Sequence, residues 1–83
     1  MKIKAIYDNG GKTFDRFTVY YDVKERNGHY EGRGMSENPM HPQGFGQCCS
    51  GQLGRHNGKR ITLEELPAKC QEIINRDIET LSA

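Results

Sequence analysis

Four residues with metal-binding side chains lie close together in one glycine-rich segment: His41, Cys48, Cys49 and His56. Imidazole and thiolate groups are the ligands that zinc prefers, so this set could form a metal site. Structural zinc motifs, however, separate paired ligands by about two to four residues, whereas adjacent cysteines in an extended backbone point to opposite sides. The spacing therefore favours small half-buried cysteines and hydrogen-bonding loop histidines, and we expect no metal or other cofactor.

The same residues could carry out nucleophilic catalysis. In that interpretation Cys48 or Cys49 attacks a substrate while His41 or His56 acts as the base. A thiol enzyme also needs an orienting acid and a preformed oxyanion hole, and the sequence places neither of them. We therefore predict that the protein is not an enzyme, and a zinc site or a thiol enzyme is the third choice among the functions considered.

The glycines of this segment do not match a phosphate-binding loop. Dinucleotide and P-loop fingerprints lie between a strand and the helix that they open, and the P-loop ends in Gly-Lys-Ser or Gly-Lys-Thr. Here "GFGQCCSG" leads into further loop, and neither tripeptide occurs. Repeated tight turns of the chain explain the glycines better.

Basic residues offer a different kind of chemistry, because they occur with two tyrosines that we expect to be exposed, Tyr20 and Tyr30. Guanidinium groups beside aromatic rings suit the phosphates and stacked bases of a nucleic acid, or an acidic patch on a protein. The opposing interpretation is a solvated loop with local salt bridges to Glu31 and Glu37. We favour a binding surface, and its candidate residues are Tyr30, Arg33, Arg55, His56, Lys59 and Arg60.

Residues 1–35 are predicted to form an antiparallel β-meander that positions part of this surface. "DNGG" and "RNGH" are typical hairpin turns, and the runs between them are rich in β-branched and aromatic residues. The first strand should place three apolar residues on one face, with Ile6 breaking the alternation: Ile3, Ala5 and Tyr7. The second strand should place three others on one face: Phe17, Val19 and Tyr21.

Residues 36–61 are predicted to form a long, ordered, glycine-rich loop. Pro39 and Pro42 restrict the backbone at its start, and Phe45 and Leu53 are isolated apolar anchors. We expect a short extended piece at its end, around Arg60 and Ile61. Loops of this length inside a compact domain are uncommon and are frequently functional, so this segment is the expected location of binding residues.

Residues 62–81 are predicted to form an amphipathic helix that packs on the sheet. Thr62 and Glu65 match a capping box, which predicts one turn over residues 63–66. The main helix should follow, from Pro67 to Glu79, with the proline in its first turn. Its apolar stripe is expected to bury four residues: Cys70, Ile73, Ile74 and Ile78. The sequence thus predicts an α+β fold with a three- to four-stranded antiparallel sheet and one C-terminal helix.

The composition describes a single small domain, residues 1–83. The apolar fraction is 34%, so the core must be small, and a homodimer would be a natural supplement. The net charge of +1 argues against a large positively charged surface that binds nucleic acid. The sequence shows neither a secretory signal nor an apolar run long enough to span a bilayer. We expect a cytoplasmic protein whose three cysteines are reduced thiols.

Three stretches, "GMSENPMHPQGFGQ", "GRHNGKRI" and "LPAKCQEIINRDI", resemble small proteins of phages and integrated mobile elements, over roughly residues 30–78. Chains of this size and origin include inhibitors of host defence, among them anti-CRISPR proteins, which act by occupying a surface. The resemblance therefore implies a non-catalytic, phage-encoded inhibitor that binds a host defence (CRISPR-Cas) complex in the host cytoplasm. A small nucleic-acid-binding protein that uses the same basic segment is the alternative.

Overall fold

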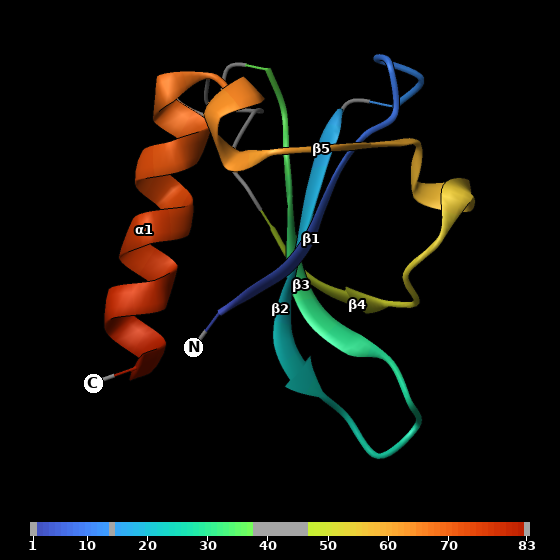
Figure 1. Ribbon diagram of the computed structural model, residues 1–83, viewed down its shortest axis with the longest axis vertical. Helices are drawn as coiled ribbons and strands as arrows, with labels where there is room; N and C mark the ends of the chain where they lie inside the picture. Colours follow the sequence, from blue (N-terminus) through green and yellow to red (C-terminus); the bar gives the residue numbers. More distant parts are fainter. Residues whose placement is uncertain (1, 14, 38–46, 83) are drawn as a thin grey trace.

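The computed structural model describes residues 2–13, 15–37 and 47–82. The described chain forms a five-stranded antiparallel sheet in the order β4-β3-β2-β1-β5, with one helix against it (Figure 1). The elements are β1 (Ile3–Asp8), β2 (Phe17–Lys24), β3 (Tyr30–Met35), β4 (Gln47–Gly51), the 3₁₀ turn η1 (Arg55–Asn57), β5 (Lys59–Ile61), the 3₁₀ turn η2 (Leu63–Glu65) and α1 (Ala68–Ser82). The predicted α+β class is confirmed, and the sheet has slightly more strands than predicted.

The first hairpin forms where the turn residues predict it. The side chains of Asp8 and Asn9 accept hydrogen bonds from the backbone N–H groups of Gly10 and Gly11, at 2.8 and 2.9 Å. Both glycines have positive φ angles, 77° and 87°, which residues with a side chain rarely adopt. This turn holds β1 against β2.

A β-bulge in β1 explains the break in the hydrophobic pattern of that strand. Ile3 pairs with Tyr21 and Ala5 pairs with Tyr20, the adjacent residue of β2. Lys4 is therefore an extra residue in β1. The bulge shifts the alternation, because one additional residue exchanges the two faces of a strand. Ile3 and Ile6 consequently pack in the cluster under the helix, whereas Ala5 and Tyr7 belong to a cluster on the opposite face. The prediction that Ile3 shares a face with Ala5 and Tyr7 is wrong.

The segment predicted as one long loop, residues 36–61, contains two strands. β4 pairs with β3 and β5 pairs with β1, so the segment carries the chain from one edge of the sheet to the other. The extended piece expected around Arg60 and Ile61 is β5. The sequence "QCCSG" does not predict β4, because it lacks the β-branched and aromatic residues that mark strands. Three of the predicted anchor and turn residues lie outside the described residues: Pro39, Pro42 and Phe45.

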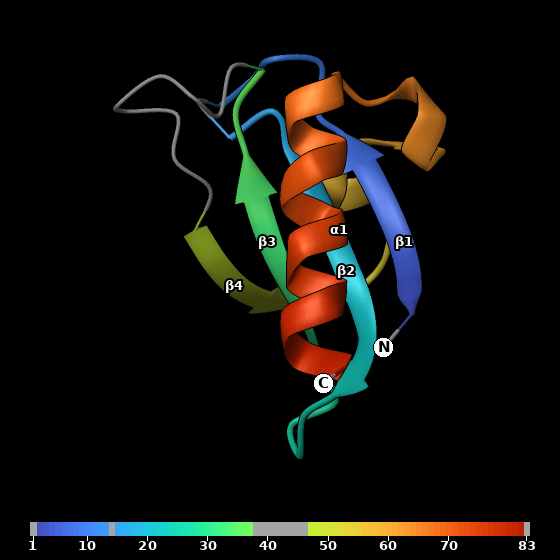
Figure 2. The same cartoon turned by 90° about the vertical axis from the view of Figure 1, so that its left-hand side faces the viewer.

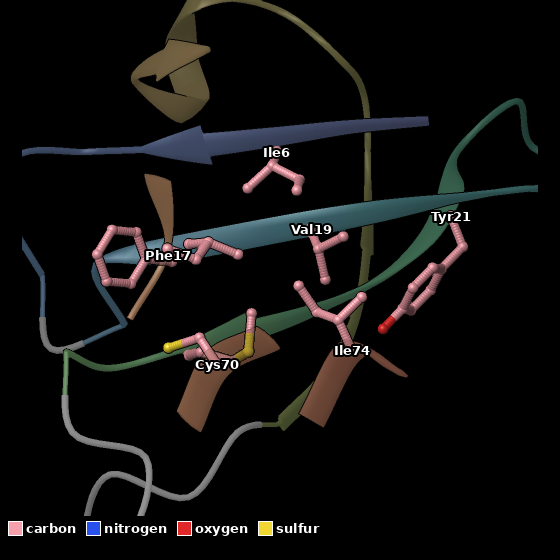
Figure 3. Packing of buried hydrophobic residues seen from close by; sticks show 8 residues of the cluster. Ile6, Phe17, Val19, Tyr21, Cys70 and Ile74 are labelled. Carbon is pink, nitrogen blue, oxygen red and sulfur yellow. The ribbon is translucent and has the colours of Figure 1, made fainter. Parts of the chain in front are cut away.

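Helix α1 covers one face of the sheet and runs along β2, with β1 and β3 on either side (Figure 2). Cys70 and Ile74 have no exposed surface, and Ile73 and Ile78 pack at the margin of the same cluster. Burial raises the pKa of the Cys70 thiol to about 11. The buried cluster consists of Ile6, Phe17, Val19, Tyr21, Met35, Leu66, Cys70 and Ile74 (Figure 3).

The turn before α1 forms as predicted, but Pro67 precedes the helix and does not lie in its first turn. The carboxylate of Glu65 accepts a hydrogen bond from the backbone N–H of Thr62 at 2.7 Å, which fixes the turn η2. The helix then begins at Ala68, directly after Pro67. Among the described residues, no helix is long and apolar enough to cross a membrane.

The opposite face of the sheet is covered by the connection from β4 to β5, and η1 and α1 lie on opposite sides of the sheet (Figure 1). The Tyr20 hydroxyl donates a hydrogen bond to Oδ1 of Asn57 at 3.0 Å, which ties η1 to the middle of the sheet. A Cβ atom on Gly32 would lie 2.8 Å from the Tyr20 ring, so this glycine is required for the ring to pack on β3. The second cluster consists of Ala5, Tyr7 and Tyr20, with Tyr30 and Leu53 at its margin.

Gly58, between η1 and β5, is the glycine for which we predict a measurable substitution cost. Its φ angle is 109°, and a Cβ atom there would lie 2.3 Å from the carbonyl oxygen of Asp8. Replacing Gly58 by Ala should destabilise the fold by about 2–3 kcal/mol, because strain and the backbone clash add. Thermal and urea unfolding would measure this cost. Gly10→Ala is the matched control, since Gly10 has a φ angle of 77° but open space around it; an equal loss in both variants would contradict the clash.

Candidate binding surface

Three cations surround a hollow at the junction of η1 and β5. Arg55 belongs to η1, while Lys59 and Arg60 belong to β5, where Arg60 pairs with Tyr7 of β1. All three cations are exposed, whereas Tyr7 is buried. The hollow has a volume of about 500 Å³ and is lined by Tyr7, Gly54, Arg55, Gly58, Lys59 and Arg60.

Further cations continue this surface across the face opposite the helix. The Arg60 guanidinium donates a hydrogen bond to the Lys4 carbonyl at 3.2 Å. The Nζ atoms of Lys4 and Lys24 each lie 5.7 Å from the centroid of the Tyr30 ring, within the range of a cation–π contact. These contacts connect the hollow with Tyr30. We call the whole set the basic strip: Lys4, Lys24, Tyr30, Arg55, Lys59 and Arg60.

The cations of the basic strip have no salt bridge with any carboxylate of the described residues, where ion pairs are formed by Arg16, Arg33 and Lys69. Asp8, the carboxylate opposite Lys59 in the sheet, is held by Arg16. The hydrogen bond from Arg16 is the main cause of the lowered pKa of Asp8, and Lys59 contributes only a smaller attraction. The strip is therefore a concentration of positive charge that forms no salt bridge within the described part of the chain.

Arg33, a predicted binding residue, lies on the other face of the sheet. Its Nε and Nη2 atoms donate to the two carboxylate oxygens of Asp77 on α1, at 2.5 and 2.9 Å. The side chains of Arg33 and Asp77 are only 19% and 15% exposed. Tyr21 also donates to Asp77, at 2.7 Å, and its pKa is raised first by burial and then by that hydrogen bond. Arg33 thus joins the sheet to the helix and does not join the other candidates.

His56 is exposed but lines a separate hollow, of about 330 Å³, on the same side of the sheet as η1. Tyr20, Cys49 and Asn57 also line it. The candidate binding residues therefore divide into three places. Tyr30, Arg55, Lys59 and Arg60 belong to the basic strip, His56 lies beside it, and Arg33 lies on the helix face.

The thiol and imidazole candidates come together only in part. Cys49 is exposed and lines the same hollow as His56. His41 and the side chain of Cys48 lie outside the described residues. Within the part of the chain that the structure describes, no three His, Cys, Asp or Glu side chains are grouped as a metal site requires.

Sequence reasoning missed three residues of this surface. From the sequence, Tyr7 is predicted to be an ordinary core residue of a strand. Lys4 and Lys24 are predicted to be strand residues whose charges face solvent. The bulge brings Lys4 to the face that carries Tyr30, and a bulge has no reliable sequence signal. The pairing of Tyr7 with Arg60 could have been inferred only by recognising that β5 joins β1.

Comparison of the chain with protein-family models, with curated proteins and with solved structures gives no match. The geometry of the site is therefore the basis for a functional proposal.

Proposed function

We propose that the protein is a non-catalytic binding protein that uses the basic strip to occupy an acidic surface of another protein. The observation that carries this proposal is that Arg55, Lys59 and Arg60 surround the hollow without a salt bridge to any carboxylate of the described residues. Arginine and tyrosine are among the residue types most enriched at the positions that dominate protein interfaces. The lysines beside Tyr30 extend the same charge and would guide the approach of an acidic partner.

Within this proposal, the resemblance to phage and mobile-element proteins points to a particular kind of partner. The protein would be a phage-encoded inhibitor in the host cytoplasm, and its target would be a host defence complex of the CRISPR-Cas type. Such an inhibitor needs only to cover a surface, and an exposed strip with a pocket at one end supports that role without requiring catalysis.

A small nucleic-acid-binding protein is the second candidate. It is favoured by Tyr30, because lysines beside a partly exposed ring are typical of surfaces that hold phosphates and stack bases. The total charge of +1 favours the protein partner, since nucleic-acid binding depends on neutralising many phosphates.

The test is capture of a partner from bacterial lysate by immobilised protein, followed by binding measurements with the purified partner. The double variant Arg55→Glu and Lys59→Glu reverses two exposed charges of the strip and should weaken binding at least about 100-fold, with an unfolding midpoint close to that of the wild type. The matched control is Lys12→Glu with Arg26→Glu, which reverses two exposed charges in the hairpin turns. It changes the net charge equally and should bind normally.

Two results would contradict the proposal. Equal loss of binding in both double variants would mean that only net charge matters. Capture that disappears after nuclease treatment of the lysate would replace the protein partner by a nucleic acid, which is the second candidate.

A further inference from the structure

Tyr7 lines the hollow at the end of the basic strip, and no other described residue accepts a hydrogen bond from its hydroxyl. Tyr7 is 5% exposed, and its hydroxyl oxygen accepts a hydrogen bond from the backbone N–H of Gly54 at 3.1 Å. Among the described residues, its O–H hydrogen has no acceptor. The hydroxyl therefore has one hydrogen-bond partner and keeps its O–H available for an acceptor that enters the hollow.

The position of this hydroxyl is fixed. The Tyr7 ring packs edge to face against Tyr20, with centroids 6.1 Å apart and planes at 71°. Tyr20 is in turn hydrogen-bonded to Asn57 of η1. The backbone N–H of Gly54 donates to the hydroxyl oxygen, so the donor is positioned before any ligand arrives. Preorganised donors lose little conformational freedom on binding.

The charges around the hydroxyl select an anion. Arg55, Lys59 and Arg60 line the same hollow, and Gly54 and Gly58 contribute no side chains that would fill it. A guanidinium group can bind two oxygens of one anion side by side, while Tyr7 donates to one of them. The walls are otherwise formed by an aromatic ring, glycine backbone and the alkyl stems of long cations, which suit a ligand that carries methylene groups next to its charge.

We infer that this hollow is an anchor site for the carboxylate of an acidic side chain, Glu or Asp, of the protein partner. The inference rests on the proposed function and names the group that the partner inserts. A glutamate side chain matches the site because its methylenes pack between the alkyl stems while its two oxygens meet Tyr7 and an arginine. A phosphodiester of a nucleic acid carries its charge between two sugars and not at the end of a flexible methylene chain.

The inference is tested on the full chain with small probes. Glutarate represents the glutamate side chain and inorganic phosphate represents the competing anion, and both are titrated at constant ionic strength while the amide NMR signals are recorded. Glutarate should shift the signals of Gly54, Arg55 and Gly58 and should bind more tightly than phosphate. Tyr7→Phe should weaken glutarate binding about tenfold, because it removes one hydrogen bond to a charged group.

Matched variants distinguish loss of the donor from damage to the fold. Tyr21→Phe removes a buried hydroxyl on the helix face of the sheet, where it donates to Asp77, and should leave glutarate binding unchanged. Arg55→Gln keeps Tyr7 in place and should weaken glutarate binding, because it removes the fork that holds the carboxylate. Equal glutarate binding by Tyr7→Phe and the wild type, tighter binding of phosphate than of glutarate, or absence of glutarate-induced shifts in this hollow would overturn the inference.

The proposed function and this inference can fail separately. If reversal of Arg55 and Lys59 abolishes capture of the partner but Tyr7→Phe does not weaken it, the basic strip remains the binding surface and the carboxylate anchor is wrong. If glutarate binds as expected but the charge reversal leaves capture unchanged, the hollow binds carboxylates and the proposed function is wrong.

Discussion

Replacing Ile74 by Ala is expected to lower the free energy of unfolding by about 3–5 kcal/mol. Ile74 has no exposed surface and lies between α1 and the centre of the sheet (Figure 3). The truncation loses the transfer free energy of the removed carbons and leaves a cavity, because the surrounding side chains relax only in part. Chemical denaturation monitored by circular dichroism measures the loss directly.

The neighbouring residue Ile73 provides the control for this prediction. It is only partly buried at the margin of the same cluster, so Ile73→Ala should cost about 1–2 kcal/mol. A loss below half a kcal/mol in Ile74→Ala, or equal losses in the two variants, would mean that α1 does not pack on the sheet through this face. The two variants therefore test the helix packing on which the separation of the two sheet faces depends.

The helix face could be predicted because its signal is redundant. Cys70, Ile74 and Ile78 recur at the helical period, and Thr62 with Glu65 marks the preceding turn. Each signal alone is weak, but they agree on where the chain turns and which side is apolar. The second strand was predictable for a similar reason, since Phe17, Val19 and Tyr21 alternate without interruption.

The remainder of the sheet could not be predicted, because it depends on pairing and not on local pattern. β4 is stabilised by its neighbour β3 and has no strand-forming side chains in its own sequence. The bulge at Lys4 likewise has no sequence signal of its own. Its consequence was nevertheless visible, because Ile6 interrupts the alternation of apolar and polar residues. That irregularity was evidence for an extra residue in the strand, and it could have been interpreted as such.

The candidate site was predictable in its residue types and only partly in its location. The cations Arg55, Lys59 and Arg60 do meet around one hollow, because η1 and β5 are short and consecutive. Arg33 belongs elsewhere because successive residues of a strand face opposite sides, and the register of β3 directs it towards the helix. The face of the sheet that each basic residue occupies can be assigned only from the strand register.

Arg33 therefore leads to the last prediction, which separates a structural role from a binding role. Replacing Asp77 by Ala should cost about 3–4 kcal/mol, because it removes the carboxylate to which the largely buried guanidinium of Arg33 and the hydroxyl of Tyr21 both donate. Removing the ion pair of Lys69 and Glu72 should cost less than about 0.5 kcal/mol, since both of those side chains are more than half exposed. Urea denaturation of Asp77→Ala and Glu72→Ala compares the two ion pairs.

The double variant Arg33→Met with Asp77→Leu decides which role Arg33 has. It removes both charges together, so no buried charge is left unpaired, and most of the stability lost in Asp77→Ala should return. Because the basic strip lies on the opposite face of the sheet, the double variant should also bind the partner as the wild type does. If it folds with near-normal stability but loses the partner, the helix face takes part in binding and Arg33 is a binding residue after all. If it stays as unstable as Asp77→Ala, the cost does not come from removing one charge of the Arg33–Asp77 pair.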